Sequence, residues 1–209
     1  MCLQNTFQAS MHTRLILAST SPYRRELLAR LQLHFEVHAP EVDEAPHAGE
    51  SFLQTAVRLA REKAVAIAQS HPNAIVIGAD QVASCEGKRL DKPGSAERAF
   101  AQLQLQRGKT SEFITAVCVA ANAGQLVKQA SVITRVRFRD AAALPDGLLR
   151  RYIAVENPLD CAGAAKSEGL GIALIESIEG PDPTALVGLP LIALTDLLKS
   201  FELSALSQG

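Results

Sequence analysis

Residues 15–28 place two adjacent arginines at the start of a predicted helix. An apolar stretch ends in small hydroxyl residues, Ser21 is a favoured N-cap, and Pro22 suits the first helical position. Arg24 and Arg25 follow within the first turn, where the helix dipole disfavours each cation by roughly 0.3–1 kcal/mol. An anion bound at this helix end would offset that cost. The pattern therefore indicates a nucleotide phosphate site, with a solvated arginine pair on a surface helix as an equally good interpretation.

A second candidate is the carboxylate of Asp80, which lies in the segment Ile-Gly-Ala-Asp-Gln-Val at the end of an apolar strand. Ionised carboxylates are rarely buried without a partner, so Asp80 should meet a cation, a metal ion or backbone donors. A strand-end aspartate can bind a divalent metal ion or orient a water molecule for attack. The alternative is a turn or helix-capping aspartate.

Three further charged residues are weaker candidates. Glu44 lies in an acidic loop over residues 40–44, where a solvated acid is the ordinary interpretation. Lys63 lies on a predicted amphipathic helix, from which its stem can simply extend to solvent. Lys92 precedes a proline and is therefore held extended, which suits a cation that points into a cleft and equally suits an ordinary turn.

Predicted strands and helices alternate along the chain. Strands are expected at 14–18, 35–39, 73–84, 115–120 and 126–138, and helices at 22–31, 95–106, 144–155 and 191–201. A capping box at Ser51 predicts a further helix, whose apolar face carries Leu53, Val57, Ala60, Ala64 and Ile67. A glycine-rich loop is expected to lead into a last strand within 163–178. The turn signal at residues 122–124 indicates a hairpin, so the fold class is α/β with a mixed sheet.

Composition limits the possible functions. The chain has 209 residues, of which 47% are hydrophobic and 21% charged, and this suits one globular domain of two lobes or closely packed subdomains. A net charge of -1 does not suggest nucleic-acid binding. The four cysteines are scattered, so we expect reduced, mostly buried thiols in a cytosolic protein. No membrane-spanning run or secretory signal is apparent, and residues 1–13 are interpreted as a flexible N-terminal extension before a single domain over 14–209.

The order of several short blocks is more specific than any block alone. The chain contains, in sequence, Leu-Ala-Ser-x-Ser-Pro-x-Arg-Arg, Val-Asp-Glu, Leu-Ala-x-x-Lys-Ala, Ile-Gly-Ala-Asp, Lys-Pro, Ala-Gly and Val-Gly-Leu-Pro. This succession, over about residues 14–201, resembles the Maf family of nucleotide pyrophosphatases. The resemblance implies an elongated mixed β-sheet with flanking helices and two lobes around a central cleft, similar to inosine triphosphatases. It also implies a cytoplasmic enzyme, commonly a homodimer, that uses Mg²⁺ or Mn²⁺ to cleave a nucleoside triphosphate into a monophosphate and pyrophosphate.

The resemblance also assigns roles by position. Asp80 matches the family's general base, and Glu44 resembles an acid that binds the metal ion together with Asp80. The residues that match phosphate contacts are Ser19, Arg24, Lys63 and Lys92. These roles are chemically consistent, because attack on a triphosphate requires cations to neutralise its oxygens and a base to align the water.

Three positions depart from the pattern of family members that act on dTTP and UTP. Tyr23, Gln81 and Glu168 stand where those members typically carry arginine, threonine and glutamine. The trio is similar to the branch that hydrolyses 7-methyl-GTP. Methylation at N7 makes guanine cationic, so an aromatic face attracts it by about 0.5–2 kcal/mol. A carboxylate can accept hydrogen bonds from the N–H donors of the base. The alternative interpretation is that Tyr23 only packs against a strand and that Glu168 is a solvated loop acid.

The sequence leaves alternative functions open. A Maf-type enzyme for dTTP, UTP or another modified nucleotide is the nearest alternative. A second is a non-catalytic nucleotide-binding module that influences cell division. A P-loop or Rossmann domain is disfavoured because the chain has neither of the corresponding glycine-rich motifs.

Overall fold

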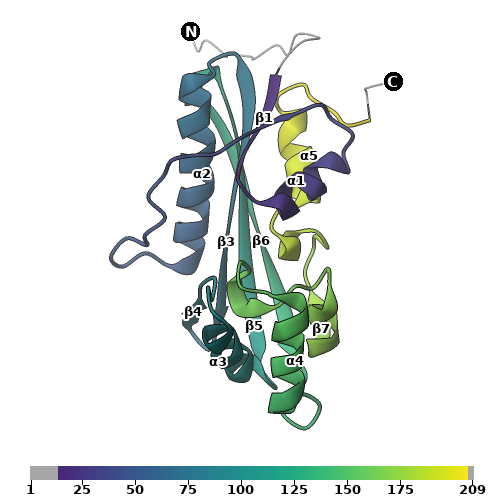
Figure 1. Cartoon of the computed structure of the whole chain (residues 1–209). Helices are drawn as coiled ribbons and strands as arrows, with labels where there is room; N and C mark the ends of the chain where they lie inside the picture. Colours follow the sequence, from purple (N-terminus) through teal and green to yellow (C-terminus); the bar gives the residue numbers. More distant parts are fainter. Residues whose placement is uncertain (1–13, 207–209) are drawn as a thin grey trace.

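The computed structural model describes residues 14–206, which form an elongated α/β domain around one mixed sheet (Figure 1). Within these residues the strands follow the order β2-β1-β3-β5-β6-β7, and β4 pairs with β3. The strands are β1 (Arg14–Ala18), β2 (Glu36–His38), β3 (Ala74–Cys85), β4 (Lys88–Leu90), β5 (Thr110–Ala121), β6 (Leu126–Phe138) and β7 (Ile175–Glu179). The helices are α1 (Pro22–Ala29), α2 (Phe52–Ser70), α3 (Ala96–Gln106), α4 (Asp146–Glu156) and α5 (Leu191–Lys199).

The long strands β3, β5 and β6 run through both halves of the molecule and join them (Figure 1). In the upper lobe α2 covers one face of the sheet, while α1 and α5 cover the other. In the lower lobe α3 and α4 pack around Phe138. The predicted mixed sheet is confirmed, because β1 pairs in parallel with β3 whereas β5 and β6 form an antiparallel hairpin. The turn of that hairpin is a short 3-10 helix, η1 (Asn122–Gly124).

Several boundaries differ from the sequence-based prediction. Helix α1 ends at Ala29, and Gln32 has a positive φ in the turn that follows. Strand β4 was not predicted, because its three residues are too few to show an alternation of apolar and polar side chains. Much of segment 163–178 forms short 3-10 helices, η2 (Ala162–Ala164) and η3 (Leu170–Leu174), before β7.

The predicted capping box of α2 is confirmed, since the side chains of Ser51 and Gln54 each accept a hydrogen bond from the other's backbone N–H. Ala60, Ala64 and, at 9% exposure, Ile67 are buried as predicted. The assignment of Leu53 to the buried face is wrong: its side chain is 41% exposed. It lies in the first helical turn, directly after the largely exposed loop 40–50.

The thiols of Cys85 and Cys118 are free and buried, and that of Cys161 is free and half-buried. Burial raises the pKa of the Cys118 thiol to about 12, so this side chain behaves as a small apolar residue. Within the described residues no helix is both long and apolar enough to cross a membrane. The proposed extension, residues 1–13, lies outside the described part of the chain.

Gly78 allows α2 to lie directly against β3. A Cβ atom at this position would overlap the backbone carbonyl of Ala60 and would lie 2.6 Å from the backbone nitrogen of Ala64. Both neighbours are backbone atoms of a helix, so neither can turn aside. The glycine of the Ile-Gly-Ala-Asp block and the small residues of the Leu-Ala-x-x-Lys-Ala block are therefore parts of one contact. This contact sets the distance between α2 and the strand that carries Asp80.

We expect Gly78→Ala to destabilise the protein by about 1–3 kcal/mol, because α2 must move away from β3. For a domain of this size that corresponds to a Tm lower by roughly 2–12 °C. Thermal unfolding followed by circular dichroism measures the shift. Gly147→Ala is the matched control, since Gly147 lies in α4 and a Cβ there meets nothing within 4 Å. That variant should be neutral or slightly more stable, and equal losses in both variants would contradict the packing role of Gly78.

Candidate active site

A gap along one edge of β3 creates the site. On one side β3 pairs with β5 from Val76 to Cys85. On the other side β3 pairs with β1 only as far as Gly78, and its pairing with β4 begins only at Ala83. Residues 79–82 therefore have no strand neighbour on that edge, and Asp80 and Gln81 lie in the opening. Because adjacent strand residues point to opposite faces, Asp80 reaches α2 while Gln81 reaches the turn before α5.

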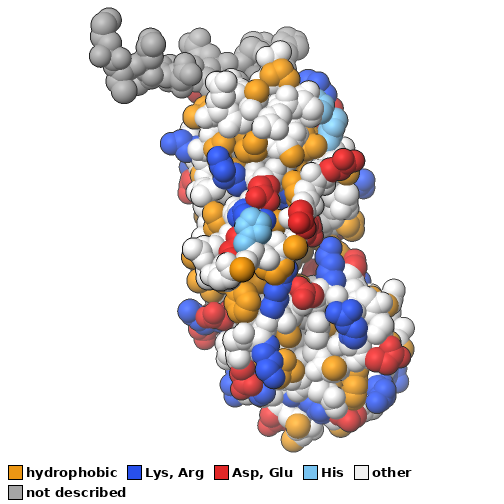
Figure 2. Space-filling view, turned by 90° about the vertical axis from the view of Figure 1, so that its left-hand side faces the viewer, with side chains coloured by type: hydrophobic (Ala, Val, Ile, Leu, Met, Phe, Trp, Pro, Cys, Tyr) orange, Lys and Arg blue, Asp and Glu red, His pale blue; other side chains and the backbone are white. Residues whose placement is uncertain are grey.

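A cleft of about 540 Å³ occupies this gap between the two lobes. In space-filling view, acidic and basic side chains gather around the middle of the molecule (Figure 2). The cleft is lined by every residue to which the resemblance assigned a role: Ser19, Tyr23, Arg24, Glu44, Lys63, Asp80, Gln81, Lys92 and Glu168. Side chains separated by up to about 150 residues in sequence thus meet at one place, as the resemblance implied.

Lys63 is the centre of the charged cluster. Its Nζ lies 2.7 Å from Oδ1 of Asp80 and 2.6 Å from Oε1 of Glu44. The side chains of Lys63 and Asp80 are only 6% and 10% exposed, whereas that of Glu44 is 62% exposed. The ammonium is therefore shared by two carboxylates, one from the core of the sheet and one from the acidic loop.

Opposing effects act on the pKa of Glu44. Burial is the largest and raises it, but the hydrogen bond and charge of Lys63, together with the charges of Lys92 and Arg24, hold the pKa below its ordinary value. Glu44 is therefore ionised at neutral pH. Its loop is fixed to α2 by Arg58, which donates to both carboxylate oxygens of Glu50 and to the carbonyl oxygen of Ala45.

The helix end formed by Ser19–Arg24 is organised as the sequence predicted. The Ser21 hydroxyl accepts from the backbone N–H of Arg24, which makes Ser21 the N-cap of α1. The Arg24 Nε donates to the carbonyl of Gly188 at 2.9 Å, and its Nη1 lies 3.5 Å from Oγ of Ser19. Burial lowers the pKa of the Arg24 guanidinium, and the charges of Asp80 and Glu44 oppose that change. Arg25 instead faces solvent, so the arginine pair is divided between the cleft and the surface.

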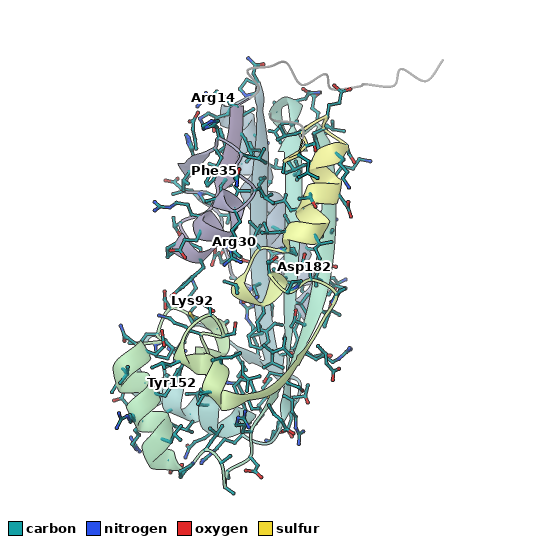
Figure 3. The ribbon with its side chains drawn as sticks, turned by 90° about the vertical axis from the view of Figure 1, so that its right-hand side faces the viewer. Arg14, Arg30, Phe35, Lys92, Tyr152 and Asp182 are labelled. Carbon is teal, nitrogen blue, oxygen red and sulfur yellow. The ribbon has the colours of Figure 1, made fainter. Side chains whose placement is uncertain are left out.

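The cations of the cleft come from both sides of the gap. Lys92 follows β4 at the upper edge of the lower lobe, and Figure 3 shows it beside the opening between the lobes. Arg24 and Lys63 come from α1 and α2 of the upper lobe. A polyanion in the cleft would therefore meet positive charge from two directions.

Tyr23 and Glu168 lie on opposite sides of the same cleft. The Tyr23 hydroxyl donates to Oδ2 of Asp160 at 3.2 Å, across the gap. Burial is the largest of several effects that raise the pKa of Tyr23, so the phenol stays protonated. The Nζ of Lys166 lies 5.8 Å from the centre of the Tyr23 ring, which shows that a cation can approach this ring. Glu168 is exposed at the mouth, and Ser167 donates to it.

The carboxylates of Glu44 and Asp80 suit a hard divalent cation such as Mg²⁺ or Mn²⁺, which prefers oxygen ligands. Among residues 14–206 no group of three or more His, Cys, Asp and Glu side chains forms a metal centre. A pair of carboxylates fits a cation that takes its other ligands from water and phosphate oxygens.

Sequence reasoning missed four polar residues of the site. Arg89, Asp91 and Asp160 line the cleft, and Arg89 donates to Asp91 at 2.7 Å. They lie in β4 and in loops, where the sequence pattern does not indicate which charged residues belong to a site. Thr115 was missed because it reads as an ordinary strand residue, although its hydroxyl contacts Gln81.

Comparison with known proteins identifies the family of this chain. A 7-methyl-GTP pyrophosphatase of Cupriavidus pinatubonensis is 54% identical over 186 residues, which cover 89% of this chain and 92% of that protein. A protein of the same name from Ralstonia nicotianae is 54% identical over 190 residues, covering 91% and 96%. A solved HAM1 protein from Coxiella burnetii shares 14% identity over 60% of this chain and 73% of that one, with a TM-score of 0.40, too low to add to the assignment. The family model described as Maf-like protein matches residues 14–201, and the chain belongs to the Maf family.

Proposed function

We propose that this Maf protein hydrolyses the bond between the α- and β-phosphates of 7-methyl-GTP, producing 7-methyl-GMP and diphosphate. Two relatives that are 54% identical over about nine tenths of the chain carry the name of this activity. The observation that carries the proposal is the convergence of Asp80, Lys63 and Arg24 in one cleft with Tyr23 and Glu168. Such an enzyme would remove a modified nucleotide from the cellular pool.

The charged cluster supplies the groups that the reaction needs. Asp80 aligns a water molecule and accepts its proton while the water oxygen bonds to the α-phosphorus. The bond from that phosphorus to the bridging oxygen breaks, and the electron pair leaves with diphosphate. Arg24, Lys63 and Lys92 stabilise the charge that develops on the leaving group, with Ser19 as a further phosphate contact. A divalent cation held by Glu44 and Asp80 would supply charge neutralisation and a template for the phosphate oxygens.

The base is recognised where the two lobes face each other. The Tyr23 ring attracts the cationic 7-methylguanine by about 0.5–2 kcal/mol. Glu168 accepts hydrogen bonds from N–H donors of the base and adds charge attraction for its methylated form. A neutral pyrimidine offers neither a matching pair of donors nor a positive charge, so it gains neither the hydrogen bonds nor the charge attraction.

A substrate panel tests the proposal directly. Purified protein is incubated with 7-methyl-GTP, GTP, dTTP or UTP, with Mg²⁺ or Mn²⁺ added, and released diphosphate is measured. We expect the highest kcat/KM for 7-methyl-GTP. Faster hydrolysis of dTTP or UTP would favour the other Maf activity, and binding without release from any triphosphate would favour a nucleotide-binding regulator. Dependence on a divalent cation, a cytoplasmic location and a homodimer remain predictions from the family resemblance.

Glu168→Gln should reduce the preference for the methylated base. The amide keeps the size of the side chain but removes its negative charge, which favours the cationic base over the neutral one. We expect the ratio of kcat/KM for 7-methyl-GTP to that for GTP to fall by about 3- to 10-fold, because GTP hydrolysis is lowered less than hydrolysis of the methylated nucleotide. Steady-state kinetics with both nucleotides measure this ratio. Glu176→Gln, an exposed acid on β7, is the control, and an unchanged ratio in Glu168→Gln would remove that residue from base selection.

A further inference from the structure

Arg89 is a cation of the cleft to which neither the local pattern nor the family resemblance gives a role. It lies on β4, opposite Ser84 of β3, and its side chain is 27% exposed. The next residue, Leu90, is buried in the core of the lower lobe, so Arg89 and its partner Ser84 point to the other face of the sheet. Val82 and Asp80 precede Ser84 at even spacing on β3 and share that face. Arg89 therefore lies on the face of the sheet that carries Asp80.

The sheet divides the cleft into two parts. Asp80 contacts Lys63 of α2 on one face, whereas Gln81 contacts the turn before α5 on the other. Tyr23 comes from α1, which covers the same face as α5. With a base bound at Tyr23 and the α-phosphorus at Asp80, the β- and γ-phosphates would extend along the face of α2. Arg89 is then on the same side of the sheet as the end of the phosphate chain.

The guanidinium of Arg89 is held at one end only. Its Nε donates to Oδ1 of Asp91 at 2.7 Å, and Gln102 of α3 donates to the carbonyl oxygen of Asp91 at 2.8 Å. Among residues 14–206 the two terminal nitrogens have no hydrogen-bond partner, and Nη1 is buried. A buried donor without a partner is costly, the more so on a charged group. Arg89 lines the cleft, so a substrate can supply that partner, and the terminal nitrogens together can bind two phosphate oxygens.

We propose that Arg89 binds the terminal phosphate of the nucleoside triphosphate and keeps this contact with the diphosphate that leaves. Asp91 holds the guanidinium in place through Nε, which leaves the terminal nitrogens for the phosphate. Lys92 lines the same cleft one residue after Asp91 and adds positive charge beside this contact. The inference rests on the proposed function, and it concerns the phosphate chain and not the base.

The two products of the reaction separate the halves of the substrate, because only diphosphate contains the terminal phosphate. Each product is added as an inhibitor of 7-methyl-GTP hydrolysis, and its inhibition constant is measured at one free concentration of the divalent cation. We expect Arg89→Met to raise the inhibition constant of diphosphate about 10-fold and to leave that of 7-methyl-GMP within about twofold of wild type. Lys88→Met is the matched control, since Lys88 precedes Arg89 on β4 and is exposed. It should leave both constants unchanged.

A second variant separates contact from charge. Arg89→Met leaves the carboxylate of Asp91 without its partner, and that negative charge by itself repels diphosphate. The double variant Arg89→Met/Asp91→Asn removes this charge. If Arg89 binds the phosphate, the inhibition constant of diphosphate should stay raised in the double variant. A return to the wild-type value would show that Arg89 only neutralises Asp91, and it would overturn the inference.

Two other results in Arg89→Met would also overturn it. Equal weakening of both products would indicate a loosened fold. An unchanged constant for diphosphate is the result expected if a water molecule joins Nη1 to Oε1 of Gln102, which is likewise buried without a partner in the described chain. If wild-type protein hydrolyses another triphosphate faster than 7-methyl-GTP, the proposed base fails, but inhibition by diphosphate with that substrate still tests Arg89. Hydrolysis of no triphosphate would remove the proposed function together with this inference.

Discussion

Replacement of Asp80 by asparagine is expected to lower kcat for 7-methyl-GTP by roughly 10²- to 10⁴-fold, the range that general-base catalysis contributes. Asparagine has the same shape and can still accept a hydrogen bond from Lys63, which lies 2.7 Å from Oδ1 of Asp80. It cannot accept a proton from water, and it brings no negative charge to a metal ion. The loss should therefore appear in kcat more than in KM, because the side chains assigned to the phosphates and the base are unchanged.

The measurement is steady-state release of diphosphate, with thermal unfolding recorded for the same sample. Asp196→Asn is a matched control: Asp196 lies on α5, its side chain is 67% exposed, and it pairs with Lys199 on the surface. That variant should keep normal kinetics. A kcat within tenfold of wild type in Asp80→Asn, with normal folding, would remove Asp80 from the chemistry and require another base.

Much of the upper lobe could be predicted because its signals are local. The N-cap at Ser21 and the capping box at Ser51 involve residues three positions apart, and both are present as expected. The apolar run before Asp80 predicts a buried strand from its continuity alone. The order of short blocks then indicated which distant side chains belong together, and all of those side chains line one cleft.

The remaining features depend on contacts between segments that are distant in sequence. The strand predicted over 73–84 agrees with β3, but Asp80 lies in its middle and not at its end, and the opening arises because β1 and β4 leave four residues of β3 uncovered. No local pattern reports where a neighbouring strand stops. The same holds for Thr115, whose hydroxyl matters only because the turn at Ala185 packs over it.

The structure was also needed to show where each cation lies and what it contacts. The local pattern presented Arg24 and Arg25 as equivalent, and only the resemblance singled out Arg24. The helix turns Arg24 into the cleft and Arg25 to solvent, because successive residues on a helix are about 100° apart. Lys63 was assigned to phosphate by resemblance alone. Its ammonium in fact lies between two carboxylates, so its loss should affect the acidic groups as well as the phosphate.

Lys63→Met should lower kcat by about 10²- to 10³-fold, and the loss should depend on pH. Without the ammonium, Glu44 and Asp80 face each other across a partly buried space, and like charges so placed favour protonation of one carboxylate. The hydrogen bond and charge of Lys63 are what chiefly overcome the effect of burial on Glu44, so its pKa should rise in the variant. If catalysis requires ionised Glu44, the Lys63→Met variant should lose activity at a mildly acidic pH at which the wild-type protein is still active.

The acidic limb of the pH profile of kcat/KM is therefore expected at higher pH in Lys63→Met than in wild type. Arg61→Met is the matched control, because Arg61 lies on the same helix and faces solvent. The substitution removes the same positive charge as Lys63→Met. It should keep the wild-type profile, and any shift that it shows measures the general loss of positive charge. Lys63→Arg separates charge from geometry: the charge is kept, so the limb should stay near its wild-type position even where kcat falls. An unshifted limb in Lys63→Met would mean that the ammonium does not hold Glu44 in its ionised form.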